Sequence, residues 1–379
     1  MNGQLHEAGF KHRPNGRPMK ILHLAPHCDA TGNGVVNVAI DLACTQVREG
    51  HRVLFASSGG SFSDLLDSQN IERFTFPDHR FIYFFAALWN LRRLLRTFNP
   101  DIVHAHMVPG ALLVRLLRGQ LPFRLVTTIH NSMRLRASLM GVGDLVITVS
   151  DATAKDMERR GIPRHKLRVV RNGPLGSPRR AVSDDVVGGE GLLRHPAIVT
   201  VAGLFSHKGI SDLIEAFSFV ASQNRTARLY ILGDGTDRPK FERQASRKNC
   251  ADRITFCGFI DDPRPYLRNS DLFVLASHEE AFGLVLAEAR EAGCAIVACN
   301  VGGIPEVLDH GSAGILVPPR QPRVLAEVML DLLQNYERRQ LWRSRATTNI
   351  QWLDISRAST ETLAVYRETL ARGGSCFTN

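Results

Sequence analysis

The sequence lacks the cysteine patterns that cross-link small folds or bind zinc. Its 379 residues include seven cysteines, an odd number, and no two of them have Cys-x-x-Cys spacing. Most lie in apolar surroundings, so we interpret them as small buried residues of a protein in a reducing compartment. This interpretation disfavours both a disulfide framework and a structural zinc site.

Long apolar runs are also missing. The longest, Phe81 to Trp89, has nine residues, which is about half of what a membrane-spanning helix needs. Residues 1–18 contain no apolar stretch, so we expect a flexible tail there and no secretory signal. We therefore expect a cytoplasmic protein, either free or bound peripherally to the inner face of the membrane.

Several nucleotide and metal motifs are absent as well. No G-x-G-x-x-G follows the first strand-like segment of either half, and there is no G-x-x-x-x-G-K-[ST] loop. This weakens a nicotinamide dehydrogenase or an NTPase as the function. There is no Asp-x-Asp motif, and we find no compact His/Asp/Glu cluster in the sequence. We therefore predict that no metal is bound.

The positive charge is unevenly distributed. Up to Gly173 there are 23 Lys and Arg against 13 Asp and Glu, and from Pro174 onward there are 24 of each. The whole net charge of +10 therefore lies in the first half. Nucleic acid, an anionic membrane surface or an acidic acceptor would suit such a surface. An arginine-rich composition without a specific partner is the ordinary alternative.

Apolar strand-like segments alternate with helical patterns along the whole chain. The segments are residues 20–25, 52–57, 101–106, 124–130 and 145–150, then 197–203, 227–235, 254–259, 271–277 and 295–300. Continuous apolar strands separated by helices indicate parallel sheets covered on both faces. Because a Gly/Ser/Asp-rich stretch separates the two series, we predict an α/β protein with two doubly wound, Rossmann-like domains facing a cleft.

The expected domain boundaries follow from this pattern. The tail (1–18) precedes a first domain (19–175), a linker (176–194) and a second domain (195–354). Residues 354–371 form an amphipathic pattern that predicts a terminal helix.

The stretch from Ser277 to Glu306 carries the most specific chemistry. It predicts a strand, a loop and a helix that begins near Gly283 and ends at Gly293. The amides of Phe282, Gly283 and Leu284 then lie at a helix N-terminus, where free N–H groups and the helix dipole favour a phosphate. Glycine at position 283 lets a ligand approach the backbone closely.

Two carboxylates, Glu280 and Glu288, flank this anion site. Helical side chains lean toward the N-terminus, so Glu288 should point back at the same ligand. Carboxylates repel phosphate but accept hydrogen bonds from hydroxyl groups. The pattern therefore predicts a ligand with hydroxyl groups on both sides of a phosphate, which describes a nucleotide sugar.

Glu280-x7-Glu288, with Phe282-Gly283-Leu284 inside it and Gly302-Gly303-Ile304-Pro305-Glu306 after it, resembles a known signature. It is similar to that of the retaining GT-B glycosyltransferases of glycosyltransferase family 4 (glycosyl transferases group 1). The resemblance covers nearly the whole chain, since "PDIVHAH", "TTIHN", "VSDATAKD", "FSHKGISDLIEAF" and "LYILGDG" follow in the family's order. It implies a chain end that crosses back, so that helix 355–372 completes the first domain near Trp352 and Tyr366.

The resemblance also implies roles for individual residues. Glu288 would hold the nucleotide ribose, Glu280 would meet hydroxyls of the donor sugar, and Lys208 would neutralise the departing diphosphate. Gly32-Asn33-Gly34 would face the diphosphate from the first domain, and His130 would lie near the reacting sugar. The base pocket would be lined by Gly233, Cys257, Gly258 and Phe259. The donor would be a UDP- or GDP-sugar acting as co-substrate, with no cofactor.

Each residue also has an ordinary alternative. Glu280 and Lys208 could be solvated surface groups, Gly32 to Gly34 a simple turn, and His130 a buried histidine with its hydrogen bonds satisfied. We interpret His104 and His106 as structural. The chain departs from the family pattern at Gly203, where an arginine is common, and after Asn172-Gly173, where an aspartate is common.

The predicted function is transfer of a hexosyl group to a glycan or lipid-linked acceptor, with retention of configuration. The alternatives are a nucleotide-sugar epimerase on the same fold and a basic nucleic-acid-binding protein. The latter would need aromatic residues and arginines on an exposed sheet face, whereas these strands are apolar.

The segment from Arg80 to Arg96 predicts contact with a membrane. Read as a helix, it places its apolar residues on one broad face, namely Phe81, Phe84, Phe85, Leu88, Leu91 and Leu95. Arg92, Arg93 and Arg96 cluster at its C-terminal end. Such a helix suits an anionic bilayer surface. A helix packed on the first sheet with solvated arginines is the alternative.

Overall fold

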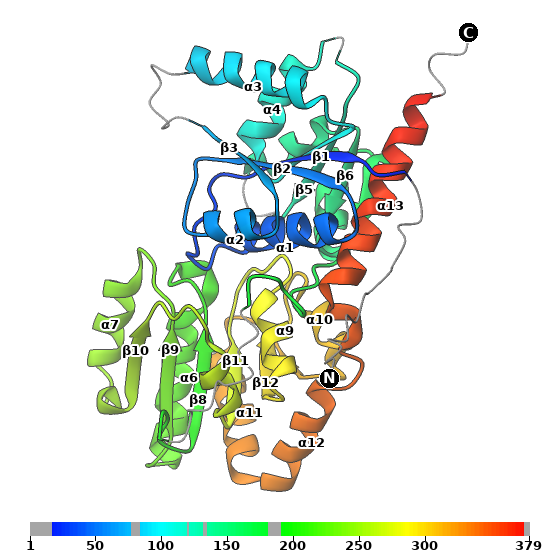
Figure 1. The fold of residues 1–379 in the computed structure, drawn as a ribbon. Coiled ribbons are helices and arrows are strands. Elements are labelled where there is room, and N and C mark those ends of the chain that lie inside the picture. Colours follow the sequence, from blue (N-terminus) through cyan, green and yellow to red (C-terminus); the bar gives the residue numbers. More distant parts are fainter. Residues whose placement is uncertain (1–16, 77–83, 120, 132–134, 181–190, 375–379) are drawn as a thin grey trace, which may run out of the picture.

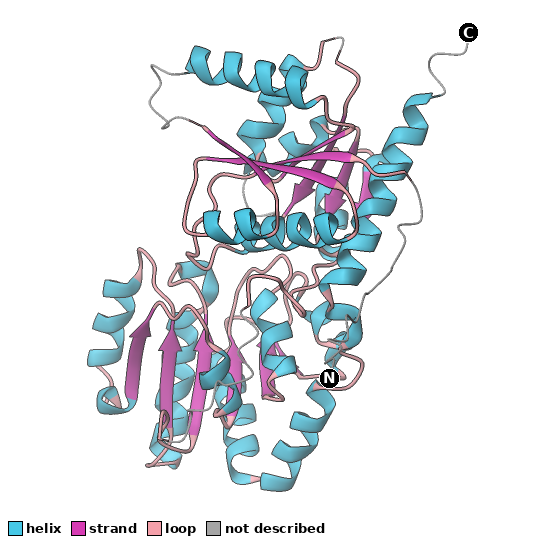
Figure 2. Cartoon of the chain, viewed as in Figure 1, coloured by secondary structure: helices cyan, strands magenta, loops and turns pink. Residues whose placement is uncertain are grey.

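The computed structural model describes residues 17–76, 84–119, 121–131, 135–180 and 191–374. It contains two sheets, each formed by parallel strands and each flanked by helices (Figures 1 and 2). Residues 1–16 of the predicted tail, much of the predicted linker and the start of the predicted membrane segment lie outside the described residues. None of the described helices has the length and hydropathy that crossing a bilayer requires.

The first sheet has seven strands in the order β3-β2-β1-β4-β5-β6-β7. They are β1 (Lys20–Leu24), β2 (Arg52–Ser57), β3 (Glu72–Thr75), β4 (Ile102–Ala105), β5 (Arg124–Ile129), β6 (Leu145–Thr148) and β7 (Leu167–Val169). Helices α1 (Gly34–Arg48), α2 (Ser63–Ser68) and α13 (Ile355–Gly374) pack on one face. Helices α3 (Phe84–Phe98), α4 (Val108–Leu117) and α5 (Asp151–Arg159) pack on the other.

The second sheet has six strands in the order β10-β9-β8-β11-β12-β13. They are β8 (Ala197–Val201), β9 (Arg228–Leu232), β10 (Ile254–Gly258), β11 (Leu272–Leu275), β12 (Ala295–Cys299) and β13 (Ile315–Val317). One face is covered by α6 (Ile210–Gln223), α7 (Arg238–Ser246) and α11 (Pro322–Gln334). The other is covered by α8 (Arg264–Arg268), α9 (Leu284–Glu291), α10 (Ile304–Val307) and α12 (Tyr336–Ala346).

This architecture confirms the predicted pair of doubly wound sheets, and all ten predicted strands are present. The sequence missed three strands, β3, β7 and β13, and each of them lies at a sheet edge. They are only three or four residues long and partly exposed, so they lack the continuous apolar run that marks a central strand. Helices cover both faces of each sheet, so the described strands form no exposed aromatic face for nucleic acid.

Helix α13 joins the two halves. It begins beside the second domain and runs along the first (Figure 1). Leu363, Val365 and Tyr366 are buried in the core of the first sheet, and Tyr366 is fully covered. At the start of this crossing, Trp352 packs edge-on against Phe282 and donates to Asp309 Oδ1 at 3.2 Å.

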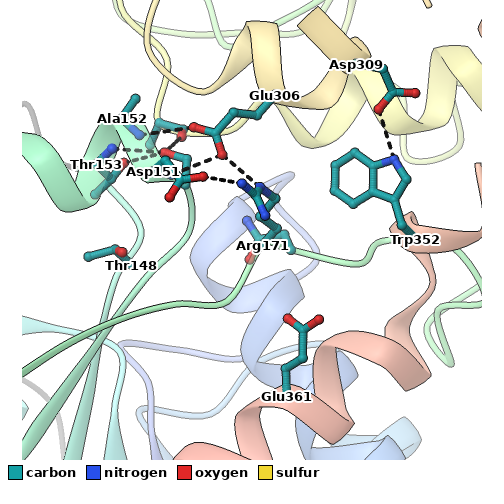
Figure 3. Close-up of polar contacts among 12 residues, drawn as sticks. Thr148, Asp151, Ala152, Thr153, Arg171, Glu306, Asp309, Trp352 and Glu361 are labelled. Carbon is teal, nitrogen blue, oxygen red and sulfur yellow. Dashed lines mark hydrogen bonds and ion pairs between the residues drawn. The ribbon is translucent and has the colours of Figure 1, made fainter.

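A second contact between the domains centres on Glu306 of α10. Its carboxylate accepts hydrogen bonds from the amides of Asp151 and Ala152, both at 3.0 Å, in the first turn of α5 (Figure 3). Arg171, which follows β7, donates to the same carboxylate at 2.8 Å and also pairs with Asp151. The side chain of Glu306 is only 7% exposed. A carboxylate of one domain therefore caps a helix of the other.

We expect Glu306→Ala to lower the free energy of unfolding by about 3 kcal/mol, because it leaves two amides and a guanidinium without their buried acceptor. Glu361→Ala removes an exposed carboxylate that pairs with Arg357 and should change stability by at most about 0.5 kcal/mol. Urea unfolding followed by tryptophan fluorescence measures both values. Equal changes in the free energy of unfolding would show that the Glu306 contact does not stabilise the interface between the domains.

Candidate functional site

The two sheets present their carboxyl edges to each other. Each sheet changes winding direction once, between β1 and β4 in the first and between β8 and β11 in the second. Ligands of doubly wound folds bind at such positions. A cleft of about 440 Å³ lies between the loops after β1 and those after β8 and β9, and it reaches the first turns of α9.

The N-terminus of α9 faces this cleft. The helix begins at Leu284 after Gly283, whose φ is 91°, and it has no side-chain cap. The amide of Leu286 donates to the carbonyl of Gly283 at 2.9 Å, and the amides of Leu284 and Val285 at the very start of the helix are available to an anion. Leu284, Val285 and Glu288 line the cleft. The sequence predicted this helix start and the glycine at its cap, and the structure confirms both.

Gly302 explains why two glycines follow the Glu-x7-Glu pattern. A Cβ atom at position 302 would lie 1.8 Å from the carbonyl oxygen of Glu280, and the φ of Gly302 is 52°. The amide of Gly303 donates to that same carbonyl at 3.0 Å. The glycine pair therefore supports the loop that carries Glu280.

Glu280 and Lys208 form an ion pair. Lys208 ends a 3₁₀ turn (Ser206–Lys208) after β8, and its Nζ donates to Glu280 Oε2 at 2.6 Å. The two side chains are 20% and 14% exposed. Neither residue lines the cleft itself, and Glu280 instead lines a neighbouring cavity of about 510 Å³ against α5. Two of the three predicted catalytic groups, Lys208 and Glu280, therefore neutralise each other's charge.

Glu288 also has a cationic partner. Arg180, from the end of the described linker, donates to Glu288 Oε1 at 3.1 Å and to Glu291 Oε2 at 2.5 Å. Burial raises the pKa of Glu288, and the charge of Arg180 opposes that rise. The preceding residue, Arg179, makes a bidentate pair with buried Asp41 of α1, at 2.8 and 2.9 Å. Both arginines line the cleft.

The glycine loop of the first domain closes the other side of the cleft. Asn33 caps α1 by accepting a hydrogen bond from the amide of Val35 at 3.1 Å. A Cβ atom at Gly34 would lie 3.0 Å from Leu284 Cδ1 of the second domain, so a larger residue there would require the Leu284 side chain to shift. Gly32 faces Phe259 in the same way.

His130 lies in the first domain, outside the central cleft. It lines a cavity of about 1050 Å³ together with Asn33, His27 and residues of α4 and of the turn at Leu135–Val142. Its Nε2 lies 3.0 Å from Nδ1 of His106. The sequence left open whether His130 is a buried histidine or a site residue, and the structure shows it hydrogen-bonded on one side and facing a cavity.

Behind His130 lies a group of buried histidines. His23, His104 and His106 place one ring nitrogen each within 4.8 Å of the others. The expectation that the chain has no compact cluster of this kind is therefore wrong, because β1 and β4 are adjacent in the sheet although far apart in sequence. Burial lowers the pKa of His23 and of His130 to about 4. The pKa values of His104 and His106 are also lowered, by burial and by the neighbouring histidines.

The structure brings most of the predicted donor-site residues to one cleft but not all of them. Gly32, Gly34, Gly233, Phe259, Leu284 and Glu288 line it together. The side chain of Phe282 is buried in the core, and Cys257 lies on strand β10 outside the lining. Gly258 contributes through its backbone, since its carbonyl accepts from the amide of Gly233 at 2.7 Å.

The sequence reasoning missed Arg179 and Arg180. They lie in a Gly/Ser/Asp-rich stretch that looked like a linker, and no motif marks them. The available signal was two adjacent arginines in a chain that has Gly203 where the family commonly has an arginine. His27 was missed too, although it follows the first strand and lies 3.4 Å from Asn33 through Nε2 and Nδ2.

The chain matches two family models that together span most of its length. "Glycosyltransferase Family 4" covers residues 32–173, and "Glycosyl transferases group 1" covers residues 192–349. The chain belongs to the group 1 glycosyltransferases of family 4. The first model covers β2 to β7 of the first sheet of this glycosyltransferase, and the second model covers the whole second sheet.

Curated relatives of this glycosyltransferase catalyse different reactions. It is 25% identical over 344 residues to the N-acetyl-alpha-D-glucosaminyl L-malate synthase of Bacillus anthracis, covering 81% of this chain and 85% of that one. It is 27% identical over 297 residues to a glycogen synthase of Mycobacterium tuberculosis, covering 70% and 69%. These matches give the epimerase alternative no support.

Solved structures show the same fold. Anabaena Alr3699/HepE in complex with UDP and glucose superposes with a TM-score of 0.79 at 20% identity, covering 92% of this chain and all of that one. WaaG, a glycosyltransferase involved in lipopolysaccharide biosynthesis, superposes with a TM-score of 0.71 at 17% identity, covering 91% and 99%. The glycosyltransferase therefore has the GT-B fold.

The buried histidines should make the glycosyltransferase acid-sensitive. A histidine whose pKa is lower in the folded state binds fewer protons there than in the unfolded state. Its contribution to the free energy of unfolding is therefore fully present above pH 6.5 and is lost as the pH falls toward 4. His23 alone should remove about 2 kcal/mol between pH 7 and pH 5. Urea unfolding at the two pH values measures this loss. His23→Gln should reduce it, and an unchanged loss would contradict the assignment.

Proposed function

We propose that the protein transfers a hexosyl group from a nucleotide diphosphate sugar to an acceptor, with retention of the anomeric configuration and without a metal ion. One observation carries the proposal. The central cleft places the uncapped N-terminus of α9 beside the carboxylate of Glu288 and opposite the glycine loop at Gly34. This combination suits a ligand in which a ribose adjoins a diphosphate.

Each part of the donor has a matching group in this proposal. Glu288 accepts hydrogen bonds from the ribose hydroxyls, and the first-turn amides of α9 bind the distal phosphate. Lys208 lies one turn after β8, and we propose that it moves from Glu280 to the diphosphate when the donor binds. Glu280 is then free to accept from hydroxyls of the sugar. The UDP in the HepE structures supports the choice of a nucleotide donor.

Arg180 is our candidate for the cation that Gly203 does not supply. It lines the same cleft as Gly203 and is held there by Glu288 and Glu291. The ribose competes for Glu288, so donor binding releases one partner of Arg180. The guanidinium can then contribute to the charge that stabilises the leaving diphosphate. Arg179 is less available for this role because its Nε and Nη2 both donate to buried Asp41.

We place the acceptor in the larger cavity beside His130. Its lining includes Met107, Leu112, Ile129 and Leu139, and the side chains of Leu112 and Leu139 are 39% and 42% exposed. His27, Asn33, His130 and Arg136 add polar groups to this lining. Apolar walls with a polar end suit an acceptor that carries a lipid or another apolar group.

Lys208→Ala, Glu280→Ala and Glu288→Ala should each reduce transfer at least about 100-fold, because each removes a group assigned to the donor. A panel of UDP- and GDP-sugars, screened first by thermal shift, identifies the donor. Activity should persist in EDTA, and NMR of the product should show the anomeric configuration of the donor.

Lys248→Ala is the matched control, since Lys248 forms a similar lysine–glutamate pair with Glu215 away from the cleft. It should leave transfer unchanged. Near-full activity of Lys208→Ala would refute the role of Lys208. Activity lost in EDTA and restored by manganese would refute metal independence, and an inverted product would refute retention.

Contact with a membrane remains part of the proposal, but through a different face of α3. Leu91 and Leu95, which the sequence analysis assigned to the membrane, are buried against the first sheet. That face was needed to cover the sheet. Phe81 lies outside the described residues. The exposed side of α3 carries Trp89, which is 62% exposed, with Arg92, Arg93 and Arg96.

Two features make this exposed side suitable for an anionic bilayer. The guanidinium of Arg93 lies 5.7 Å from the centre of the Trp89 ring. On α4, which packs beside α3, Leu116 is 72% exposed. Exposed tryptophan and leucine beside arginines are typical of surfaces that bind at the headgroup level.

Replacing Arg92, Arg93 and Arg96 together by glutamine should weaken co-sedimentation with anionic vesicles at low salt, because each cation adds about 1 kcal/mol. The control replaces Arg225, Arg243 and Arg247 of the second domain by glutamine, which removes the same charge from another surface. Equal weakening by both triple variants would indicate an effect of net charge alone. If wild type does not co-sediment, the membrane contact is wrong.

A further inference from the structure

Three histidines of the first domain are joined ring to ring by hydrogen bonds. Nδ1 of His23 lies 3.0 Å from Nε2 of His106, and Nδ1 of His106 lies 3.0 Å from Nε2 of His130. The chain of bonds ends inside the domain at Gln46 of α1, whose Oε1 lies 2.9 Å from Nε2 of His23. At its other end, His130 faces the cavity assigned to the acceptor.

The sheet places these rings on one face. His23 and His104 are paired in register on the parallel strands β1 and β4. Side chains two residues apart on an extended chain point the same way, so His106 follows His104, and His130 follows Thr128 of β5. His23 and Gln46 are completely buried, and His106 is 4% exposed. No solvent is needed to complete the bonds between them.

The donors and acceptors of these hydrogen bonds can be assigned in only two ways. A neutral imidazole donates through one nitrogen and accepts through the other, so fixing one ring fixes the next. Gln46 presents its carbonyl oxygen to His23, while its amide nitrogen lies 3.5 Å from the hydroxyl of Tyr366. A carbonyl oxygen can only accept, so His23 donates through Nε2. His106 and His130 must then donate through Nε2 as well.

Tyr366 supports this direction from the side. Its hydroxyl lies 2.6 Å from Nδ1 of His104, and Nε2 of His104 lies 2.6 Å from the hydroxyl of Thr128. Tyr366 can donate to His104 and accept from Gln46 at the same time. The terminal helix α13 thus helps to hold the amide of Gln46 in the orientation that sets the direction of the chain.

We infer that Gln46, His23 and His106 are positioning residues that hold His130 as the Nε2–H tautomer, with the lone pair of Nδ1 directed to the ligand. No described residue forms a hydrogen bond with Nδ1 of His130. A lone pair accepts from a hydroxyl and repels a phosphate or a carboxylate. His130 therefore selects a hydroxyl group of the reacting sugar or acceptor. This role rests on the proposed transferase function, whereas the tautomer does not.

A metal ion is the competing explanation for the cluster of His23, His104 and His106. Every ring nitrogen of these three residues already has a hydrogen-bond partner within 3.0 Å. An ion would have to displace several of these bonds in a fully buried position. Hydrogen bonding among neutral rings satisfies all six nitrogens without a charge.

The direct test uses ¹⁵N-histidine-labelled full-length protein without ligands. Long-range ¹H–¹⁵N spectra distinguish protonated from unprotonated ring nitrogens, and a variant of each histidine assigns the signals. We expect His23, His106 and His130 to be neutral and protonated at Nε2. Protonation of His130 at Nδ1 would overturn the inference. Stoichiometric zinc in the purified protein, with metal-shifted histidine signals, would overturn it too.

Variants of His106 test whether the chain acts on His130. In His106→Gln the amide can still donate to His23 and accept from His130, so the tautomer of His130 should persist. His106→Phe removes the hydrogen bonds to His23 and His130, so the His130 signals should show a mixture of tautomers. His51→Gln is the control. His51 is another buried histidine of the same domain, but it takes no part in the hydrogen bonds that link His23, His106 and His130.

The same variants separate this inference from the proposed function. With whichever nucleotide sugar proves active, starting with UDP-glucose, His106→Phe should lower kcat roughly 10- to 100-fold. His106→Gln should recover most of the loss, and KM for the donor should change little. Equal losses in His106→Gln and His106→Phe would contradict positioning. If no sugar nucleotide is active, the proposed function fails while the spectra still decide the tautomer.

Discussion

Glu306 joins the two domains through a largely buried carboxylate. Its carboxylate lies in the second domain but satisfies the first amides of α5 and the guanidinium of Arg171 in the first. A buried carboxylate at a helix N-terminus is favourable only while the helix stays in place. The loop after β11, which carries Glu280, is supported from the same segment through Gly302 and Gly303. Domain orientation and loop conformation therefore depend on one short stretch of chain.

Four charged groups of the candidate site form two ion pairs. Lys208 neutralises Glu280, and Arg180 neutralises Glu288. Such pairs keep partly buried charges from being left without a partner, which would cost several kcal/mol. A ligand that carries both hydroxyl groups and a diphosphate can replace both pairs at once, since it offers donors to the carboxylates and an anion to the cations. A simple phosphate or a simple sugar would satisfy only half of the groups.

The sequence predicts features that are set by residues close together along the chain, and it does not predict features that depend on residues far apart. The helix start at Gly283 and the pattern from Glu280 to Glu288 are local, and local spacing was enough to predict them. The edge strand β13 and the pairing of Arg180 with Glu288 depend on tertiary contacts that no local pattern encodes. The histidine cluster is the clearest case. A single strand predicts His104 and His106 as structural, and only the sheet shows that His23 lies beside them.

The position of α13 has a consequence for how the chain is made. The first domain needs Leu363, Val365 and Tyr366 to complete one face of its sheet, yet these residues follow the entire second domain in the sequence. During synthesis the face of the first sheet that α1 and α2 cover remains incomplete until the second domain has emerged. The second domain has its own cores and can fold before the first is complete. A truncation that removes α13 would thus damage the first domain, although the break in the chain follows the second.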